Sequence, residues 1–332
     1  MRVLIAPDKL RGTLSARAAA QALSEGLVAA GVETICLPLS DGGEGFLDAL
    51  GGPNRTSEVR NAFGIPAVAP WRLSGARATI ESAIVIGYVP GVIPDPAGAE
   101  AASSYGLGEL VAEALRAGVR QVNIGLGGSA TTDGGAGALE ALEGLLPFDP
   151  GCAIVLATDV TTRYLAAAGV FGPQKGADPA AVVRLERRLA VQAELLRARF
   201  ARDVNVVAGA GAAGGLAGGL WAAGASIVPG FDFVAALVGL ESQVAAADLV
   251  VTAEGRLDRT SFTGKVVGGV LAAAGRAGVR AVVVAGQADR ETIRGSPAPV
   301  IDLSERFGDK RSIEATADCL RQAAPLVLAA WL

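Results

Sequence analysis

Residues 1–39 read MRVLIAPDKLRGTLSARAAAQALSEGLVAAGVETICLPL and decide the expected fold. The apolar run at 3–6 predicts a buried strand, and the run at 34–39 predicts a second one. Between them, Ser15 is suited to cap the start of a helix and Gly31 to end it. A strand, a helix and a strand in this order favour an α/β protein with parallel strands.

The last third of the chain repeats this pattern. Apolar runs at 248–252, 280–285 and 300–303 predict three more strands, and helices are expected from Lys265 and from Ile313. Five strands with helices between them suit a flavodoxin-like sheet.

The middle of the chain has a different texture. Residues 61–80 alternate apolar and polar side chains, which predicts antiparallel strands. Further strands are expected at 121–124, 153–157 and 204–208, and an amphipathic helix at 184–202. We therefore expect two domains: a discontinuous flavodoxin-like domain of residues 1–60 plus 241–332, and a mixed α/β domain of residues 61–240 inserted into it.

Composition excludes several classes of protein. The formal net charge is -4, and no basic stripe of the kind that binds nucleic acid occurs. The uncharged stretch 204–231 is long enough to span a bilayer, but it contains eight glycines and lacks an aromatic belt. The three cysteines are widely spaced and form neither a metal pattern nor a disulfide framework. We expect a cytoplasmic protein, with homo-oligomerisation left open.

The chain contains no histidine. Catalytic triads that use histidine and zinc sites that use histidine ligands are therefore excluded. Acid–base chemistry must be carried out by Asp, Glu, Lys, Tyr or Cys side chains.

Three glycine-rich turns are candidate anion sites, because glycine lets backbone N–H groups approach a phosphate. They span residues 125–135 (GLGGSATTDGG), 209–215 (GAGAAGG) and 41–45 (DGGEG). The turn at 209–215 matches the G-x-G-x-x-G pattern of dinucleotide-binding proteins, so an NAD-dependent dehydrogenase is an alternative. Tight packing of helices would also account for its glycines. A Walker A motif is absent. Gly264-Lys265 could end such a motif, but the glycine required five residues before Gly264 is replaced by Arg259.

Charged side chains follow several of the predicted strands, at the edge where open α/β sheets bind ligands. Asp8 and Arg11 follow the first strand, and Asp159 follows the strand at 153–157. The segments Glu254-Gly255-Arg256-Leu257-Asp258 and Phe171-Gly172-Pro173-Gln174-Lys175-Gly176 add further charges beside glycines.

Taken in order, these motifs resemble those of the type I glycerate kinases. The matching segments are IAPD at 5–8, DGGEG at 41–45, GLGGSATTDGGAGAL at 125–139, FGPQKGA at 171–177, GAGAAGGL at 209–216, EGRLD at 254–258 and Gly264-Lys265. They span almost the whole chain. The resemblance implies two α/β domains with the active site in the cleft between them, and ATP- and Mg²⁺-dependent phosphorylation of D-glycerate to 2-phosphoglycerate.

The resemblance assigns roles to particular side chains. Asp159 is the first choice for the base that accepts the proton of the substrate hydroxyl, and Asp133 the second. Asp133 and Glu254 are candidate Mg²⁺ ligands, and Lys175 is a catalytic cation. The residues expected to bind the phosphates of ATP are Gly127, Gly128, Ser129, Thr131, Arg256 and Lys265. Those expected to bind the substrate are Asp8, Arg11, Asp41 and Glu44, with Arg11 on the carboxylate.

The chain also departs from the family pattern. Lys9-Leu10-Arg11-Gly12 stands where the family usually has Ser-Phe-Lys-Gly, and Thr132 replaces an asparagine. Changes at Lys9, Tyr105 and Leu107 leave open a kinase that acts on another small sugar acid. A binding protein without catalytic activity is a further alternative.

Overall fold

The computed structural model describes residues 1–89, 91–263 and 265–331. They form two compact units, each with its own sheet. The first unit comprises Met1–Asp41, Asp48–Leu50 and Phe231–Leu332, and the second comprises Gly42–Leu47 and Gly51–Gly230. The chain is thus an α/β protein in which one unit is inserted into a discontinuous other one.

The first unit contains a five-stranded sheet in the order β11-β10-β9-β1-β2, and all its neighbouring strands are parallel. Numbered within the unit, this order is 2-1-3-4-5, which is the flavodoxin-like arrangement expected from the sequence. The strands are β1 (Arg2–Ile5), β2 (Glu33–Cys36), β9 (Leu249–Leu257), β10 (Arg280–Ala288) and β11 (Val300–Asp302).

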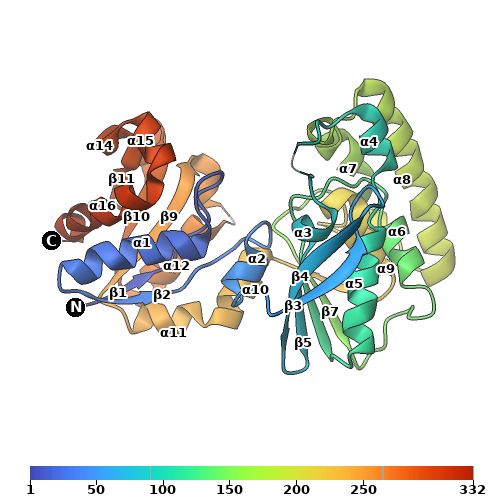
Figure 1. Ribbon diagram of the computed structural model, residues 1–332, viewed down its shortest axis with the longest axis horizontal. Helices are drawn as coiled ribbons and strands as arrows, with labels where there is room; N and C mark the ends of the chain where they lie inside the picture. Colours follow the sequence, from blue (N-terminus) through green and yellow to red (C-terminus); the bar gives the residue numbers. More distant parts are fainter. Residues whose placement is uncertain (90, 264, 332) are drawn as a thin grey trace. The chain divides into compact units, whose positions relative to one another are not determined.

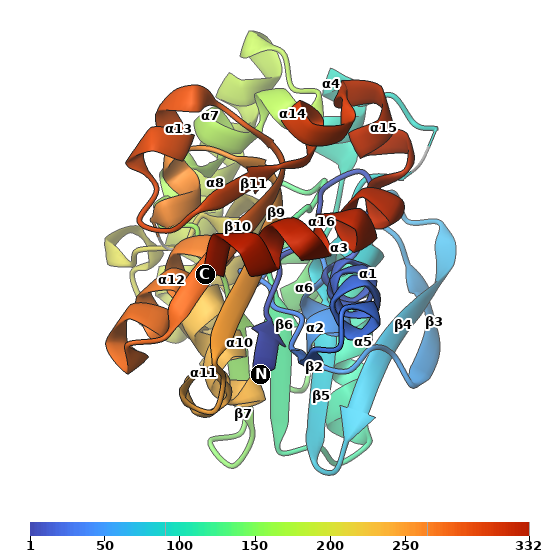
Figure 2. The same cartoon turned by 90° about the vertical axis from the view of Figure 1, so that its left-hand side faces the viewer.

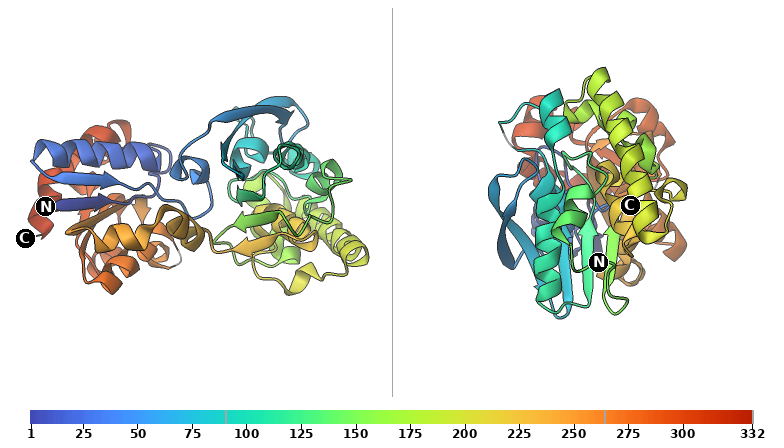
Figure 3. Two further views of the ribbon diagram at one scale, coloured as in Figure 1. Left: turned by 90° about the horizontal axis from the view of Figure 1, so that it is seen from below. Right: turned by 90° about the vertical axis from the view of Figure 1, so that its right-hand side faces the viewer.

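Helices cover both faces of this sheet (Figures 1 and 3). Helix α1 (Ala16–Ala29) packs beside α16 (Thr316–Trp331), which crosses β10 in Figure 2, and α12 (Val266–Ala277) lies with α11 (Leu240–Ala245) on the other face. The Ser15 hydroxyl accepts a hydrogen bond from the Ala18 N–H and caps α1 as predicted. The remaining helices are α10 (Gly230–Val238), η5 (Arg259–Phe262), α13 (Arg290–Gly295), α14 (Leu303–Phe307) and α15 (Asp309–Glu314).

The second unit contains a six-stranded mixed sheet in the order β3-β4-β5-β6-β7-β8. The three strands β3 (Arg55–Arg60), β4 (Pro66–Ser74) and β5 (Arg77–Glu81) are antiparallel, as the alternating pattern predicted. The strands from β5 onward are parallel: β6 (Gln121–Gly125), β7 (Ala153–Ala157) and β8 (Ser226–Val228). The carboxyl ends of β5 to β8 therefore meet at one edge.

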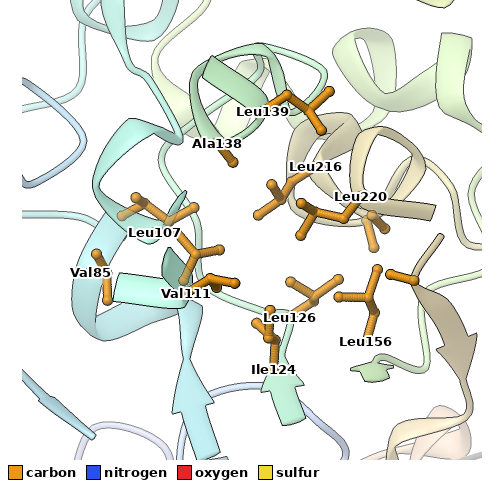
Figure 4. Close-up of a cluster of buried hydrophobic side chains, with 14 of the residues drawn as sticks. Val85, Leu107, Val111, Ile124, Leu126, Ala138, Leu139, Leu156, Leu216 and Leu220 are labelled. Carbon is orange, nitrogen blue, oxygen red and sulfur yellow. The ribbon is translucent and has the colours of Figure 1, made fainter. Parts of the chain in front are cut away.

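Part of the core of the second unit lies between this sheet and helices α5, α6 and α9 (Figure 4). Ile124 and Leu156 of the sheet face Leu107 of α5 (Tyr105–Arg116), Leu139 of α6 (Ala136–Ala141) and Leu216 of α9 (Leu216–Ala222). The other elements are α2 (Phe46–Ala49), α3 (Ser82–Ile86), α4 (Pro96–Ala101), η1 (Tyr164–Ala166), α7 (Ala167–Phe171), η2 (Pro173–Lys175), α8 (Pro179–Phe200), η3 (Val204–Val206) and η4 (Ala212–Gly215).

Two details differ from the sequence expectations. The main part of the second unit runs from Gly51 to Gly230, not from 61 to 240, because β3 pairs with β4 and Phe231 packs against Gly269 of α12 in the first unit. The strand predicted at 204–208 is wrong: residues 204–206 form a 3₁₀ turn, since the Asp203 carboxylate accepts a hydrogen bond from the Asn205 N–H and closes a turn there. In the described part of the chain, no helix is long and apolar enough to cross a membrane.

Candidate active site

The glycine-rich turn at 125–135 follows β6 and leads into α6 in the second unit. Gly128, Gly134 and Gly135 have φ values of 62°, 67° and 81°, a region that favours glycine. At Gly127 a Cβ atom would lie 2.6 Å from the Cα of Gly43. The turn therefore needs glycine both for its backbone conformation and for its close contact with the turn at 41–45.

Lys175 stabilises this turn through two hydrogen bonds. Its ammonium group donates hydrogen bonds to the carbonyl oxygen of Thr131 (2.5 Å) and to the hydroxyl of Ser129 (3.2 Å). The side chain is 5% exposed. Burial lowers the pKa of Lys175 to about 8, and the carboxylate of Asp133 opposes this shift. The structure thus brings together three of the residues expected to bind phosphate or catalyse its transfer.

Asp133 is fully buried. Its Oδ2 accepts hydrogen bonds from the N–H and the hydroxyl of Ser104 (2.8 and 2.7 Å) and from the Gly137 N–H (3.2 Å). Its Oδ1 accepts one from the Gly135 N–H (3.0 Å). Because both oxygens are used and the group is enclosed, this geometry argues against the expected roles of Asp133 as base and as Mg²⁺ ligand. It supports a role in fixing the turn.

Replacing Asp133 with alanine should therefore destabilise the fold. Four buried donors would lose their acceptor, and we expect a loss of about 3–5 kcal/mol of unfolding free energy. Urea denaturation followed by circular dichroism measures this loss. The matched control is Asp178→Ala at the start of α8, where loss of one helix cap should cost about 1 kcal/mol. Equal stability of the Asp133→Ala variant and the control would contradict this role.

A carboxylate that was not among the predicted site residues binds the backbone at the turn of residues 41–45. Glu81, at the end of β5, is 5% exposed and accepts hydrogen bonds from the N–H groups of Gly45 and Leu47, both at 3.0 Å. Its position at the end of a strand could have marked Glu81 as a candidate site residue. The turn that it binds is more than thirty residues away in the sequence, so this contact could not be predicted. Glu44 of the same turn is exposed.

The turn at 209–215 packs against the first glycine-rich turn. At Gly214 a Cβ atom would lie 2.0 Å from the carbonyl oxygen of Thr131, and the Gly134 N–H donates to the carbonyl oxygen of Gly214. The turn follows η3, not a strand. Its G-x-G-x-x-G match therefore lacks the strand that a dinucleotide-binding turn requires, and its glycines serve close packing.

Asp159 lies at the carboxyl end of β7, at the same sheet edge as the first glycine-rich turn. It is half-buried, and its Oδ1 accepts a hydrogen bond from the Gly230 N–H at 2.7 Å. The hydroxyl of neighbouring Thr158 accepts from the Val160 N–H. The hydrogen bond from Gly230, the last residue of the second unit, thus orients the Asp159 carboxylate.

In the first unit, carboxylates gather at the carboxyl ends of β1, β2 and β9. Asp8 is 6% exposed, and burial raises its pKa to about 7. Lys9 opposes this shift, whereas the negative charges of Asp41 and Glu254 add to it. Burial also raises the pKa of Glu254, whose Oε2 is buried and makes no hydrogen bond within the described residues. These three side chains come from separate parts of the sequence and share one electrostatic environment.

The raised pKa of Asp8 predicts a pH-dependent stability. The unfolded carboxyl titrates near 3.8 and the folded one near 7, so the folded protein holds the proton more tightly. Its contribution to stability is full below pH 4 and is lost as the pH rises to about 7. We expect Asp8→Asn to raise the unfolding free energy at pH 8 by a few kcal/mol, on the order of the shift itself, and to have little effect at pH 4.

Urea denaturation of the wild type and Asp8→Asn at pH 4, 6 and 8 measures this difference. Asp318→Asn, an exposed carboxylate paired with Arg321, is the control. If Asp8→Asn has the same effect at every pH, Asp8 does not titrate in this range.

Lys265 precedes α12, and its ammonium group donates to the Thr260 hydroxyl at 2.9 Å. Asp258 orders the same loop by accepting hydrogen bonds from the N–H and the hydroxyl of Thr260. The positive charge of Lys265 lowers the pKa of Glu254 against the effect of burial. Gly264, the other half of the Gly264-Lys265 motif, lies outside the described residues.

Arg11 and Arg256 line a hollow of about 470 Å³ in the first unit. Gly255 and Gly286 form part of its wall, and at Gly286 a Cβ atom would lie 2.5 Å from the carbonyl oxygen of Gly255. Two guanidinium groups at one hollow suit a small anion, because each can bind a carboxylate or phosphate through two hydrogen bonds.

The described residues contain no cluster of three or more Asp, Glu, Cys or His side chains placed to hold a metal ion. Mg²⁺ in kinases is usually bound by one or two carboxylates together with substrate phosphates. The buried Oε2 of Glu254 fits one such ligand.

Known proteins share the sequence pattern and the fold of this chain. The model of the glycerate kinase family matches residues 3–150 and 143–331. The glycerate 2-kinase of Escherichia coli is 36% identical over 81% of both chains, and a glycerate kinase of Halalkalibacterium halodurans is 34% identical over 86% of this chain and 85% of its own. A crystal structure from Salmonella typhimurium LT2, described as a proposed glycerate kinase 2, superposes with a TM-score of 0.80 at 32% identity, covering 99% of this chain and 98% of the other.

The family match and the named relatives show an enzyme that transfers a phosphoryl group to an alcohol. The chain belongs to the glycerate kinase family.

Proposed function

We propose that this enzyme transfers the γ-phosphoryl group of Mg²⁺-bound ATP to D-glycerate and forms 2-phosphoglycerate. The observation that carries the proposal is the glycine-rich turn at the carboxyl end of β6, held on the buried ammonium group of Lys175. The name of the Escherichia coli relative, a glycerate 2-kinase, supports the 2-position.

The second unit supplies the phosphate-binding turn and the base in this proposal. The Gly127 and Ala130 N–H groups donate to the Ser82 hydroxyl and the Ile86 carbonyl oxygen, so the other backbone N–H groups of the turn, those of Gly128, Ser129 and Thr131, bind phosphate oxygens. Lys175 adds positive charge next to them. As the substrate oxygen attacks the γ-phosphorus, its proton passes to the carboxylate of Asp159, and ADP leaves. The pKa of Asp8 makes that side chain the second candidate for the base.

The first unit supplies cations and carboxylates. Arg11 binds the carboxylate of the substrate, and Arg256 and Lys265 neutralise phosphate charge. Glu254 is the proposed Mg²⁺ ligand, because its buried Oε2 needs a positive partner. Bound there, Mg²⁺ would supply positive charge that offsets the negative charge developing on the phosphates. Asp8, Asp41 and exposed Glu44 remain candidates for contacts to the substrate.

A kinase of another sugar acid is less well supported by the geometry. Of the substitutions that suggested it, Leu107 is fully buried in the core of the second unit, and the ring of Tyr105 stacks on the Arg60 guanidinium group at 4.6 Å. Neither side chain lines the hollow of the first unit that contains Arg11 and Arg256.

An ADP-release assay tests the proposed function. We expect release that requires Mg²⁺ and is faster with D-glycerate than with L-glycerate or four- to six-carbon sugar acids. Product formed from D-glycerate should feed enolase without added phosphoglycerate mutase. A signal that depends on the mutase would contradict the 2-position, and a faster reaction with another acid would contradict the substrate.

A further inference from the structure

An apolar hollow of about 390 Å³ lies beside the glycine-rich turn of the second unit. Its walls are formed by residues 88, 89 and 92–95, which lie between α3 and α4, by α4 itself and by Phe63 in the turn between β3 and β4. The Asn61 carboxamide oxygen accepts hydrogen bonds from the N–H groups of Phe63 and Ile65, which fixes this turn. These two hydrogen bonds therefore fix the backbone that carries Phe63, one wall of the hollow.

The linking segment exposes large apolar side chains that the core of the unit does not require. Tyr88, Val92 and Ile93 are 44%, 52% and 87% exposed, and all three line the hollow. Leaving such side chains in water forgoes the gain from burying them. A cluster of them around a concave surface is typical of a ligand site.

The hollow adjoins the turn that we assign to phosphate. The Ala130 N–H donates a hydrogen bond to the carbonyl oxygen of Ile86 (2.8 Å), and Gly87 forms a bridge with Ser129. Ala130 and Lys175 themselves line the hollow. Lys175 donates two hydrogen bonds to the turn, which leaves its ammonium group one further donor. A molecule in the hollow would thus be next to the phosphate turn and the buried ammonium group.

We propose that this hollow binds the planar base of the nucleotide, so that the second unit holds ATP from its base to its phosphates. The inference rests on the proposed kinase function and deepens it. A planar heteroaromatic ring suits apolar walls with few polar groups, and a ring joined to a phosphate chain suits a hollow that adjoins a phosphate turn. Glycerate does not suit it, because glycerate is small, anionic and polar throughout, which matches the arginine-lined hollow of the first unit.

A substitution that fills the hollow tests the proposal. Ala97 lines the hollow from α4 and is exposed, so Ala97→Trp adds bulk there without disturbing the core. Isothermal titration with ADP should show affinity at least about 10-fold weaker than the wild type. Affinity for inorganic tripolyphosphate, which has no base, should stay within about twofold. Val28→Trp, a matched exposed position on α1 of the first unit, should bind both ligands like the wild type.

The outcomes separate this inference from the proposed function. A wild type that binds neither ADP nor ATP would contradict the kinase function itself. A wild type that binds ADP, together with an Ala97→Trp variant that binds it equally well, would overturn the base site and leave the function intact.

Photolabelling of the unsubstituted protein provides a test that does not depend on the folding of a variant. After irradiation with 8-azido-ADP and tryptic digestion, the label should lie in the peptide of residues 78–116, which contains most of the hollow's wall and no internal Lys or Arg. Label confined to peptides of the first unit would overturn the proposal.

Discussion

Asp159→Asn should remove most of the catalytic rate and leave the fold and nucleotide binding nearly intact. General-base catalysis contributes about 10²- to 10⁴-fold, so we expect kcat to fall by about 10³-fold. The asparagine keeps a side-chain oxygen that can accept the Gly230 N–H, so the variant should preserve the local hydrogen bond. It cannot accept the proton of the substrate hydroxyl.

Steady-state assays and ADP titration together measure this split between kcat and affinity. The control is Asp178→Asn, because asparagine also caps helices and Asp178 only caps α8. A fully active Asp159→Asn enzyme would contradict the assignment. The role of the base would then pass to Asp8, whose buried carboxyl titrates near neutrality.

Lys265→Ala and Arg256→Ala should each lower kcat by about 10²-fold or more. Cations aimed at phosphate oxygens act mainly where charge develops in the transition state, so the loss should fall on kcat more than on KM. The stability cost should be small, since Lys265 makes one hydrogen bond to the Thr260 hydroxyl near the surface. Arg256 is exposed.

Lys310→Ala provides the matched control, because the side chain of Lys310 is 85% exposed and makes only a distant ion pair with Glu314. Its kinetics should equal those of the wild type. Unchanged kinetics in Lys265→Ala would show that Lys265 is a surface lysine of the first helical turn and not a ligand of the phosphates.

Much of the fold follows from local sequence patterns. The Ser15 cap, the alternation in residues 61–80 and the apolar runs of the flavodoxin-like unit are local signals, and the structure confirms each of them. The strand predicted at 204–208 failed for a local reason as well, because a hydrogen bond from Asn205 to Asp203 favours a turn over an extended chain.

The site could be predicted only in part, because its contacts join residues that are distant in sequence. The glycine-rich turn and Lys175 were both visible as motifs, but not the hydrogen bonds that join them. Asp133 was predicted as a base or Mg²⁺ ligand in a polar turn, and only the fold shows that Ser104, 29 residues earlier, donates two hydrogen bonds to its carboxylate. Glu81 is held by Gly45 and Leu47 in the same non-local way.

Phosphorus NMR of the reaction mixture tests the central claim most directly. With ATP, Mg²⁺ and D-glycerate, the account predicts that the γ-phosphate signal declines while the signal of a new phosphate monoester grows at the same rate. That signal should be a doublet, because the phosphorus of 2-phosphoglycerate couples to a single proton on the adjacent carbon. A triplet would place the phosphate on the terminal carbon. Inorganic phosphate as the only new signal besides those of ADP would show that no transfer to glycerate occurs.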